Sequence, residues 1–585
     1  MAGKRSIRPG LTLLLVIALL IPQLLISPRQ VDASSDKIDP ALQAKMAADP
    51  DKKLPIIVEM VPSMAPFAAG ANEQRAQAAL DLLVKLKKDG RPIGALPLIN
   101  GAAGFANAKG INALSRSSSV AFIHEDSTIQ PRGDNDDPNV TRPPGLLSAP
   151  YPRVVRADKV WLEGPTGKNI TVAVLDSGIA PHDDLTLPTN RLVAAVNFAG
   201  DRGGVPDRGG HGTHIAGVIA GNGTRSDLSK RQAQPVWSGD ADQVEYVGIA
   251  PGANVVDVRV LNQQGFGRVS SVVRGIEWVL AHRAQYNIRI INLSFGAPAR
   301  RSYRLDPLTA AIEIAWKRGV VVVVAAGNGG PNEGSVETPG IDPFAITAGA
   351  TDDHGTLPVT DDELAWFSAW GTPPDESRSK PDIIAPGRRI VSLRVPGSYL
   401  DTLFPDRVVV AKSGADYFRL TGTSMSTAIV SGVVALMLEH RPALSPDQVK
   451  AILIGTTQVY GQDSQSPPTN PAAGGAGLVD AYAAVNSPPL GVANQGLRPA
   501  DGLARALYPI LYGQPLSWND PNLAGIAWDN LAWDNLAWDN LAWDNLAWDN
   551  LAWDNLAWDN LAWDNLAWDN LAWDNLAWDS FGTLD

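Results

Sequence analysis

An alternation of short apolar runs with helix-like segments is the feature that most constrains how this chain folds. It begins at about residue 154, and the clearest apolar runs are residues 170–175, 254–261, 288–293 and 319–326. Strands that are apolar along their whole length are typical of a parallel sheet covered by helices on both faces. In an open sheet of this kind the ligand site lies beyond the carboxyl ends of the strands. Polar residues at those ends are therefore the candidates for function.

An aspartate ends the first of these runs. Residues 172–178 read VAVLDSG, so Asp176 stands at the carboxyl end of a buried strand. A carboxylate held there can accept a hydrogen bond from an imidazole and fix its tautomer. An aspartate in this position is also a common strand cap or turn residue, so this signal is weak by itself.

A histidine stands where a helix is expected to begin. Residues 210–217 read GHGTHIAG, and the apolar residues 215–220 predict a helix with His211 at its N-terminus. A helix N-terminus disfavours positive charge on a nearby imidazole, so His211 needs an acidic partner to stabilise its protonated state. His214 lies nearly one turn further into the helix, where we expect it to be structural.

A serine and an asparagine complete the candidate set. Ser424 lies in GTSMST, directly before the apolar residues 428–438, which predict a buried helix. The start of that helix supplies backbone N–H groups that can hold a developing oxyanion. Asn328 follows a buried strand in VAAGNG, where its amide can donate to the same oxyanion. The alternatives are a serine cap on a core helix and an ordinary Asn-Gly turn.

The composition excludes several other kinds of site. The chain has no cysteine, which removes disulfide frameworks, thiolate zinc sites and cysteine nucleophiles. Its seven histidines include no HExxH segment, so the ligands of that metalloprotease helix are missing. The net charge of −12 is local, because residues 526–585 contain twelve aspartates and neither lysine nor arginine. No basic patch indicates nucleic-acid binding.

The candidate residues occur in the order Asp, His, Ser, which is the order of subtilisin and differs from chymotrypsin and the α/β-hydrolases. The nucleophile segment GTSMS also lacks the G-x-S-x-G pattern of α/β-hydrolases. Over roughly residues 150–486 the chain resembles the subtilisin (subtilase, S8) family. The matching blocks are DSG at 176–178, HGTHIAG at 211–217, NLSFG at 292–296, AAGN at 325–328 and GTSMS at 422–426, supported by VGIAPGA at 247–253, KPDIIAPG at 380–387 and GAGLVDAYAAV at 475–485.

The resemblance implies a three-layer α/β/α fold with a mostly parallel sheet, and hydrolysis of peptide bonds in proteins or peptides. In that family pattern Ser424 attacks the scissile carbonyl, and His211 takes its proton and later returns it to the leaving amine. Asp176 orients His211, and the Asn328 amide holds the oxyanion together with a backbone N–H. The segments implied for substrate binding are Ser294, Phe295 and Gly296 at the pocket before the cut, and Gly265, Phe266 and Gly267 for pairing with the substrate backbone.

The sequence departs from the family pattern in three places. Residues 426–428 read Ser-Thr-Ala where the family usually has Ala-Ser/Thr-Pro, which alters the first helical turn without removing a catalytic group. Residues 225–245 and the stretch between Asn328 and Ser424 are enlarged, and extra loops near the cleft narrow substrate choice. No cofactor is expected for catalysis. Family members often carry structural calcium, whose ligands the sequence does not place.

The chain before the peptidase region, 154–486, divides into three segments. Residues 1–33 combine a basic start, an apolar run and a small-residue cleavage site, which predicts a signal peptide. An uncleaved membrane anchor is the alternative, although the run is shorter than the about 20 residues that span a bilayer. Residues 34–130 predict a small α+β unit that resembles the inhibitor-type propeptide of the family. The proline-rich residues 131–153 predict a processing linker.

The C-terminal end is a linker, 487–525, followed by tandem LAWDN repeats over 526–580. A period of five keeps no constant face on a helix or a strand. The repeats therefore predict either a turn-based solenoid or a disordered acidic tail. A solenoid ordered by calcium would tether the protein to a surface or polymer.

Together these features predict a secreted, extracellular serine endopeptidase, with attachment to the cell surface left open. Its own propeptide is expected to act as an intramolecular inhibitor until the precursor processes itself. Two alternatives stay open: a processing protease dedicated to one partner, and a surface-binding protein whose repeat tail is the main functional element.

Overall fold

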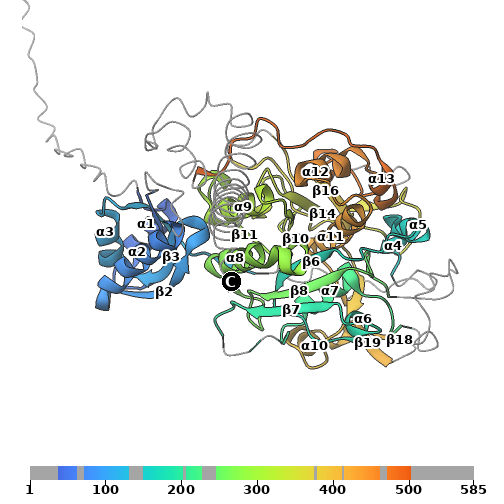
Figure 1. Ribbon diagram of the computed structural model, residues 1–585, viewed down its shortest axis with the longest axis horizontal. Coiled ribbons are helices and arrows are strands. Elements are labelled where there is room, and N and C mark those ends of the chain that lie inside the picture. The colour runs from blue at the N-terminus through green and yellow to red at the C-terminus, as the bar shows by residue number, and fades with distance from the viewer. Residues whose placement is uncertain are drawn as a thin grey trace, which may run out of the picture.

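The computed structural model describes residues 37–61, 71–130, 149–201, 204, 206–226, 246–374, 378–411, 414–461 and 471–501. The expected signal peptide and repeat tail lie outside these residues, as do most of the processing linker and the end of the second linker. A smaller N-terminal unit packs against a larger one (Figure 1). No helix within the described ranges is long and apolar enough to cross a membrane.

The larger unit is built on an eight-stranded sheet, in which the strand order is β15-β14-β12-β10-β6-β8-β7 and β16 also pairs with β14. Every pairing is parallel except that of the short edge strand β15 with β14. The prediction of a mostly parallel sheet is therefore confirmed. The strands are β6 (Thr171–Asp176), β7 (Leu192–Asn197), β8 (Asn254–Arg259), β10 (Ile288–Leu293), β12 (Val321–Ala325), β14 (Ile346–Asp352), β15 (Glu363–Leu364) and β16 (Ile383–Pro386).

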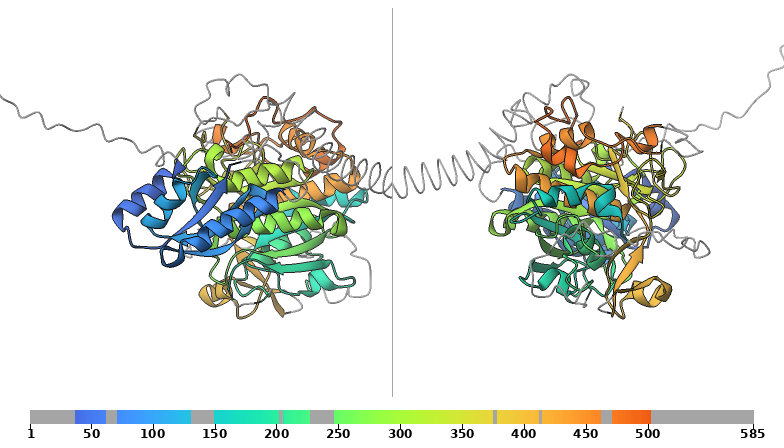
Figure 2. Two further views of the ribbon diagram at one scale, coloured as in Figure 1. Left: turned by 60° about the vertical axis from the view of Figure 1, so that its left-hand side comes forward. Right: turned by 90° about the vertical axis from the view of Figure 1, so that its right-hand side faces the viewer.

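Helices cover both faces of this sheet, so the larger unit has three layers (Figure 2). One face packs against α8 (Val269–Tyr286) and α9 (Pro307–Lys317), and the other against α7 (His211–Ala220) and α11 (Thr423–His440). Helix α11 is buried from its first residue to Leu438, as expected for a helix that is apolar on all sides.

The carboxyl ends of the central strands lie together because those strands are parallel. Strand β6 ends at Asp176, β10 ends one residue before Ser294, and β12 ends three residues before Asn328. Helices α7 and α11 begin at the same edge. The sheet therefore brings the four predicted functional segments to one place.

The N-terminal unit is an antiparallel sheet of order β2-β3-β1-β4 with helices packed on it. Its elements are α1 (Pro40–Ala48), β1 (Leu54–Met60), α2 (Ala71–Lys85), β2 (Gly90–Leu96), β3 (Gly101–Ala106), α3 (Ala108–Ser115) and β4 (Val120–Glu125). The sequence pattern predicts α2, β1, β3 and β4 but misses β2. That strand reads GRPIGAL, and its proline and glycines are tolerated because it lies at the edge of the sheet.

Smaller elements surround the ends of the main sheet. Strands β17, β19 and β18 form a separate antiparallel sheet that carries α10, within the stretch between Asn328 and Ser424 that the sequence marks as enlarged. These elements are α4 (Tyr151–Val154), α5 (Ala157–Leu162), α6 (Asp183–Thr186), α10 (Tyr399–Leu403), α12 (Pro446–Gly455), α13 (Ala481–Asn486), β5 (Thr128–Ile129), β9 (Gly267–Arg268), β11 (Ala297–Pro298), β13 (Glu337–Thr338), β17 (Ile390–Leu393), β18 (Val408–Ala411) and β19 (Gly414–Leu420).

Candidate active site

Asp176 and His211 are in direct contact at the edge of the sheet. Both carboxylate oxygens of the fully buried Asp176 lie near His211 Nδ1, at 2.8 and 2.9 Å. The backbone N–H of Ser177 donates to Asp176 Oδ1 at 2.7 Å and so fixes the carboxylate. A Cβ on Gly212 would lie 2.2 Å from the carbonyl oxygen of Gly178, so only glycine lets α7 approach β6 this closely. The contact orients the imidazole through Nδ1 and leaves Nε2 as the nitrogen that can accept a proton from a reacting group.

A second buried carboxylate, Asp207, holds the start of α7. Its Oδ1 accepts hydrogen bonds from the backbone N–H groups of Gly209 and Gly210, at 2.9 and 2.8 Å. Its Oδ2 accepts from the backbone N–H and the hydroxyl of Thr213, at 2.9 and 2.7 Å. Sequence reasoning missed Asp207, although an acidic residue just before a predicted helix is a recognisable signal.

The surroundings of His211 affect its basicity in opposite directions. Burial acts to lower the pKa of the imidazole because it disfavours the charged form. The charge of Asp176, its hydrogen bond and the charge of Asp207 act to raise it, and the net pKa lies above the usual value. The expected need of His211 for an acidic partner is therefore met by two carboxylates.

His214, one turn further along α7, has a different environment. Its Nε2 lies 3.1 Å from two main-chain carbonyl oxygens, those of Ile390 and Phe418. Burial, with a smaller contribution from the charge of His211, lowers its pKa to about 3. His214 is therefore neutral at ordinary pH and connects α7 to the separate sheet of β17, β19 and β18, which agrees with the structural role expected of it.

Ser424 is the second residue of α11 and faces the same cleft as His211. The two residues line a cavity of about 160 Å³. The Ser424 hydroxyl donates to the carbonyl oxygen of Ser294 at 2.9 Å, and the Ser294 hydroxyl donates back to the carbonyl oxygen of Ser424 at 3.0 Å. Proton transfer to His211 thus requires the Ser424 hydroxyl to leave Ser294, and catalytic hydrogen bonds often tighten only when substrate binds.

Asn328 packs against the turn that precedes Ser424. Its side-chain oxygen accepts two hydrogen bonds from Thr423, one from the backbone N–H and one from the hydroxyl, both at 2.9 Å. A Cβ on Gly422 would lie 3.0 Å from Asn328 Nδ2, so glycine lets the turn pass close to the amide without a tight contact. Thr423 holds the side-chain oxygen of Asn328 and so orients its Nδ2 donor near the start of α11.

The two segments expected to bind substrate lie on either side of an extended strand. Strand β9, which contains Gly267, pairs antiparallel with β5. Gly296 exchanges two backbone hydrogen bonds with Gln130, at 3.0 and 3.1 Å. Gly265 lines the cleft, Phe266 is 46% exposed, and Ser294 and Phe295 are buried. Both segments therefore present backbone groups to a strand, and in this chain that strand belongs to the N-terminal unit.

The arrangement contains the parts of a nucleophilic hydrolase: a hydroxyl, an imidazole in the same cleft, and a carboxylate that orients the imidazole. Among the residues that the structure describes, no group of three or more His, Cys, Asp or Glu side chains is arranged to hold a metal ion. Structural calcium, whose ligands also include main-chain and amide oxygens, stays a prediction.

Three kinds of known protein resemble this chain. AprX, a serine protease of Bacillus subtilis (strain 168), is 40% identical over 325 residues, which is 54% of this chain and 66% of AprX. Subtilisin Savinase of Lederbergia lenta is 31% identical over 313 residues, or 52% of this chain and 92% of that protein. Fervidolysin of Fervidobacterium pennivorans, a keratinolytic enzyme related to subtilisin, shares the fold with a TM-score of 0.52 and 24% identity, covering 75% of this chain and 61% of its own.

The aligned part of the chain spans just under two thirds of the length of AprX, so the comparison concerns the shared peptidase region. The model of the subtilase family matches residues 167–481, more than half of the 585 residues. All of the candidate catalytic residues fall within this match. The chain therefore belongs to the subtilase family of serine proteases.

Proposed function

We propose that this protein is a secreted serine endopeptidase that hydrolyses peptide bonds through Ser424, His211 and Asp176. The observation that carries the proposal is the contact between His211 Nδ1 and the buried carboxylate of Asp176, in a cleft that Ser424 also lines. The names of the related proteins, serine protease and subtilisin, agree with it.

The chemistry follows from the positions of these groups. The Ser424 hydroxyl attacks the scissile carbonyl carbon while His211 Nε2 takes its proton, and the negative charge of Asp176 stabilises the imidazolium. The carbonyl oxygen becomes an oxyanion, to which Asn328 Nδ2 and the Ser424 backbone N–H donate. His211 then gives its proton to the leaving amine. Water repeats the sequence on the acyl-enzyme and frees Ser424.

A labelling experiment tests the nucleophile. A serine-directed phosphonylating inhibitor should abolish casein hydrolysis and add its mass to the peptide that contains Ser424. Ser424→Ala should be inactive, unlabelled and recovered as an uncut precursor, whereas Ser294→Ala should keep the label because its hydroxyl is no nucleophile. Label on another residue, or casein hydrolysis by Ser424→Ala, would contradict the assignment.

We also propose that residues 34–130 inhibit the enzyme until they are cut away. Strand β5 of this unit occupies the position of a substrate, paired with β9 on one side, and Gln130 is bonded to Gly296 on the other. An extended peptide that adds a strand to exposed edges gains main-chain hydrogen bonds whatever its side chains are. A substrate and this strand therefore compete for the same backbone groups.

Charged side chains strengthen this junction. Both carboxylate oxygens of the fully buried Asp126 accept hydrogen bonds from Ser270 at the first turn of α8, at 2.9 Å from its backbone and 2.7 Å from its hydroxyl. Arg301 of the peptidase unit forms an ion pair with Asp39 of the N-terminal unit. A carboxylate at a helix N-terminus is favourable because of the helix dipole.

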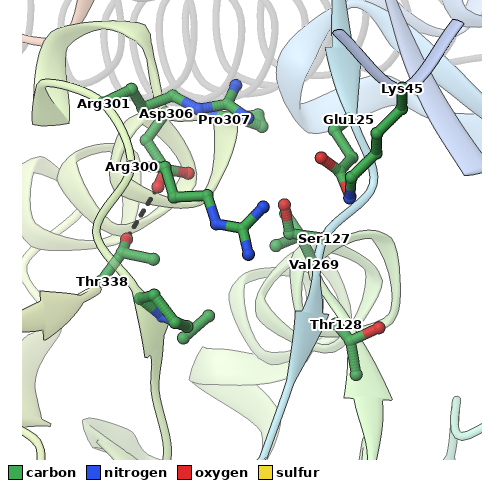
Figure 3. Close-up of a pocket in the computed structure, with 12 residues that line it drawn as sticks. Lys45, Glu125, Ser127, Thr128, Val269, Arg300, Arg301, Asp306, Pro307 and Thr338 are labelled. Atoms are coloured by element: carbon green, nitrogen blue, oxygen red, sulfur yellow. Dashed lines mark hydrogen bonds and ion pairs between the residues drawn. The ribbon is translucent and has the colours of Figure 1, made fainter. Parts of the chain in front are cut away.

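The junction is part apolar and part open. Ile57, Leu96 and Ile99 of the N-terminal unit belong to the same apolar cluster as the peptidase core. Residues of both units also line a charged pocket of about 200 Å³, into which Arg300 points from the side of Asp306 toward Ser127 (Figure 3). A junction that buries apolar groups and still admits water suits a unit that has to separate after cleavage.

The register of the strand gives the expected position of the cut. Gln130 is level with Gly296, and the two strands run in opposite directions. A polypeptide that continued in this register for two residues would be level with Ser294, whose carbonyl contacts the Ser424 hydroxyl. We therefore expect the precursor to be cut within a few residues after Gln130, at the start of the predicted linker 131–153.

Secretion rests on the predicted signal peptide, and a tether function on the LAWDN repeats of 526–580, which lie outside the described residues. N-terminal sequencing and the intact mass of the protein recovered from the medium test both. An uncut Ser424→Ala precursor in the medium that begins near residue 34, together with a mature wild-type protein that keeps its C-terminus, would agree with both proposals.

A further inference from the structure

Glu337 is a buried acidic residue beside the segment that holds the inhibitory strand. It begins β13, which pairs antiparallel with β11 directly after Gly296. Its backbone N–H donates to the carbonyl oxygen of Ala326 at 2.9 Å, and the residue is only 3% exposed. These contacts hold Glu337 between the two segments that follow β10 and β12.

Two glycines face the Glu337 side chain from those segments. A Cβ on Gly296 would lie 2.5 Å from Glu337 Oε2, and a Cβ on Gly327 would lie 2.6 Å from its Cγ and 2.8 Å from its Cδ. Gly296 is bonded to Gln130 of the inhibitory strand, and Gly327 directly precedes Asn328. The carboxylate therefore lies between the segment that holds the chain before the cut and the amide expected at the oxyanion.

The register of the strand shows which substrate residue faces Glu337. Gln130 and Gly296 lie opposite each other in an antiparallel pair, so their side-chain positions share one face. Side chains alternate along a strand, so the residue two positions after Gln130 points to the same face. In this register it is level with Ser294, whose carbonyl contacts the Ser424 hydroxyl. The residue whose carbonyl is attacked thus turns its side chain toward Glu337.

We propose that Glu337 selects a basic side chain, arginine or lysine, in the residue directly before the cut. The inference rests on the peptidase function proposed above and names its substrate class. A carboxylate that is shielded from water gains more from a bound cation than an exposed one does, and arginine can donate two parallel hydrogen bonds to it. In trypsin, an aspartate in the pocket for the residue before the cut sets the specificity in the same way.

The precursor itself carries a basic residue at the matching position. The sequence after Gln130 reads Pro131, Arg132, Gly133, so the residue two positions further along is Arg132. These three residues lie outside the described part of the chain, and the next basic residue in the sequence is Arg142. We therefore expect the precursor to be cut after Arg132.

Peptidyl nitroanilides that differ only in the residue before the cut test the preference. The series has Arg, Lys, Gln, Leu or Glu at that position. Glu337→Gln is built together with Arg132→Leu, and Glu337→Lys together with Arg132→Glu, so that each precursor presents a side chain that its own site should accept. Glu333→Gln is the matched control, because it removes the same charge at an exposed position of the same connection.

The expected result is a preference that follows the charge of residue 337. The wild type should cleave the Arg and Lys substrates at least about a hundredfold faster in kcat/KM than the Gln and Leu substrates, because a site built for a polar group strongly rejects analogues that lack it. Glu337→Gln should lose this preference. Glu337→Lys should cleave the Glu substrate faster than the Arg substrate, a gain that misfolding cannot produce, and the control should match the wild type.

Precursor processing gives a second readout that leaves the peptidase unit unchanged. Arg132→Lys should still be cut after residue 132, and N-terminal sequencing should place its mature start at Gly133. Arg132→Glu should stay uncut at this bond, and adding Glu337→Lys to it should restore the cut.

Several results would overturn the proposal. They are equal cleavage of the Arg and Leu substrates by the wild type, an Arg preference that survives in Glu337→Gln or is lost equally in Glu333→Gln, and an Arg132→Glu precursor that is cut after residue 132 as fast as the wild type. Wild-type protein that hydrolyses neither casein nor any nitroanilide would refute the peptidase function and this inference with it. Wild-type protein that hydrolyses casein without a preference for basic residues would refute this inference alone.

Discussion

Replacing Asn328 by alanine removes the side-chain donor expected at the oxyanion. We expect kcat to fall by roughly 10²- to 10³-fold with KM little changed, which corresponds to about 2.7–4 kcal/mol of transition-state stabilisation. This range is the known cost of removing such an amide in the related enzyme subtilisin, so it is transferred to this chain. KM should stay near its wild-type value because the amide donates to the negative charge of the transition state, which the bound substrate does not carry.

The contacts of Asn328 add a second effect that has to be separated from the first. Alanine also removes the oxygen that accepts two hydrogen bonds from Thr423. At about 0.5–1.5 kcal/mol each, their loss lowers the free energy of unfolding by about 1–3 kcal/mol. A disordered turn before Ser424 would lower kcat as well, so the alanine variant by itself leaves two explanations.

Two further variants separate the donor from the turn. Asn328→Asp keeps an acceptor for Thr423 but replaces the donor with a negative charge, and kcat should fall at least as far as in Asn328→Ala. Thr423→Val removes the hydroxyl bond and keeps the amide donor, and kcat should fall less than tenfold. The assay is kcat and KM on one quenched peptide, with thermal unfolding of each variant. A kcat of Asn328→Asp near the wild-type value would refute the oxyanion assignment, as would equal losses in Asn328→Ala and Thr423→Val.

Three further predictions concern pH, inhibition and maturation. His211 acts as a base only when it is neutral, and its pKa is raised, so kcat/KM should fall as the pH drops through that raised pKa. Asp207→Asn removes one negative charge near His211, so in a pH–rate profile this fall should occur at lower pH than in the wild type. Asp126→Ala removes both hydrogen bonds to Ser270 and should weaken inhibition by the N-terminal unit roughly ten- to a hundredfold, measured as residual activity of the uncleaved mixture. N-terminal sequencing should place the mature start within a few residues after Gln130, and a start near residue 34 or beyond 153 would contradict the register.

The positions of the candidate catalytic residues at the ends of strands and the starts of helices could be predicted from the sequence, because each follows a local pattern. Asp176 ends a run of apolar residues, and both His211 and Ser424 stand at the first turn of an apolar helix. Where parallel strands end, their residues come together whatever the length of the connections. Each of these local signals is weak by itself, and the order Asp, His, Ser together with the subtilase motifs singled out the three residues.

The remaining features depend on contacts between distant parts of the chain. Asp207 joins Ser177 to the start of α7: an acidic residue before a predicted helix indicates a bond to the helix N-terminus, but only the fold brings Ser177 to it. Helix α10 lines the cleft with Tyr399, Leu400 and Leu403, and backbone bonds from its first two residues to Arg208 and Gly209 hold it there. A sequence reading can report that the stretch is enlarged, but the position of an insertion is set by its tertiary contacts.

The cleft combines backbone groups that bind an extended strand with an apolar cavity beside His211 and Ser424. On the acyl side, β9 and Gly296 offer backbone groups that accept any extended chain, and the N-terminal unit occupies them. Beside His211 and Ser424, α10 adds apolar side chains to the cleft, and none of the described residues of the N-terminal unit lines that cavity. Backbone pairing gives affinity with little sequence preference, whereas a side-chain pocket selects. A substitution at an α10 residue that lines the cavity is therefore expected to change contacts with a substrate side chain and to leave the backbone pairing of the N-terminal unit with β9 and Gly296 in place.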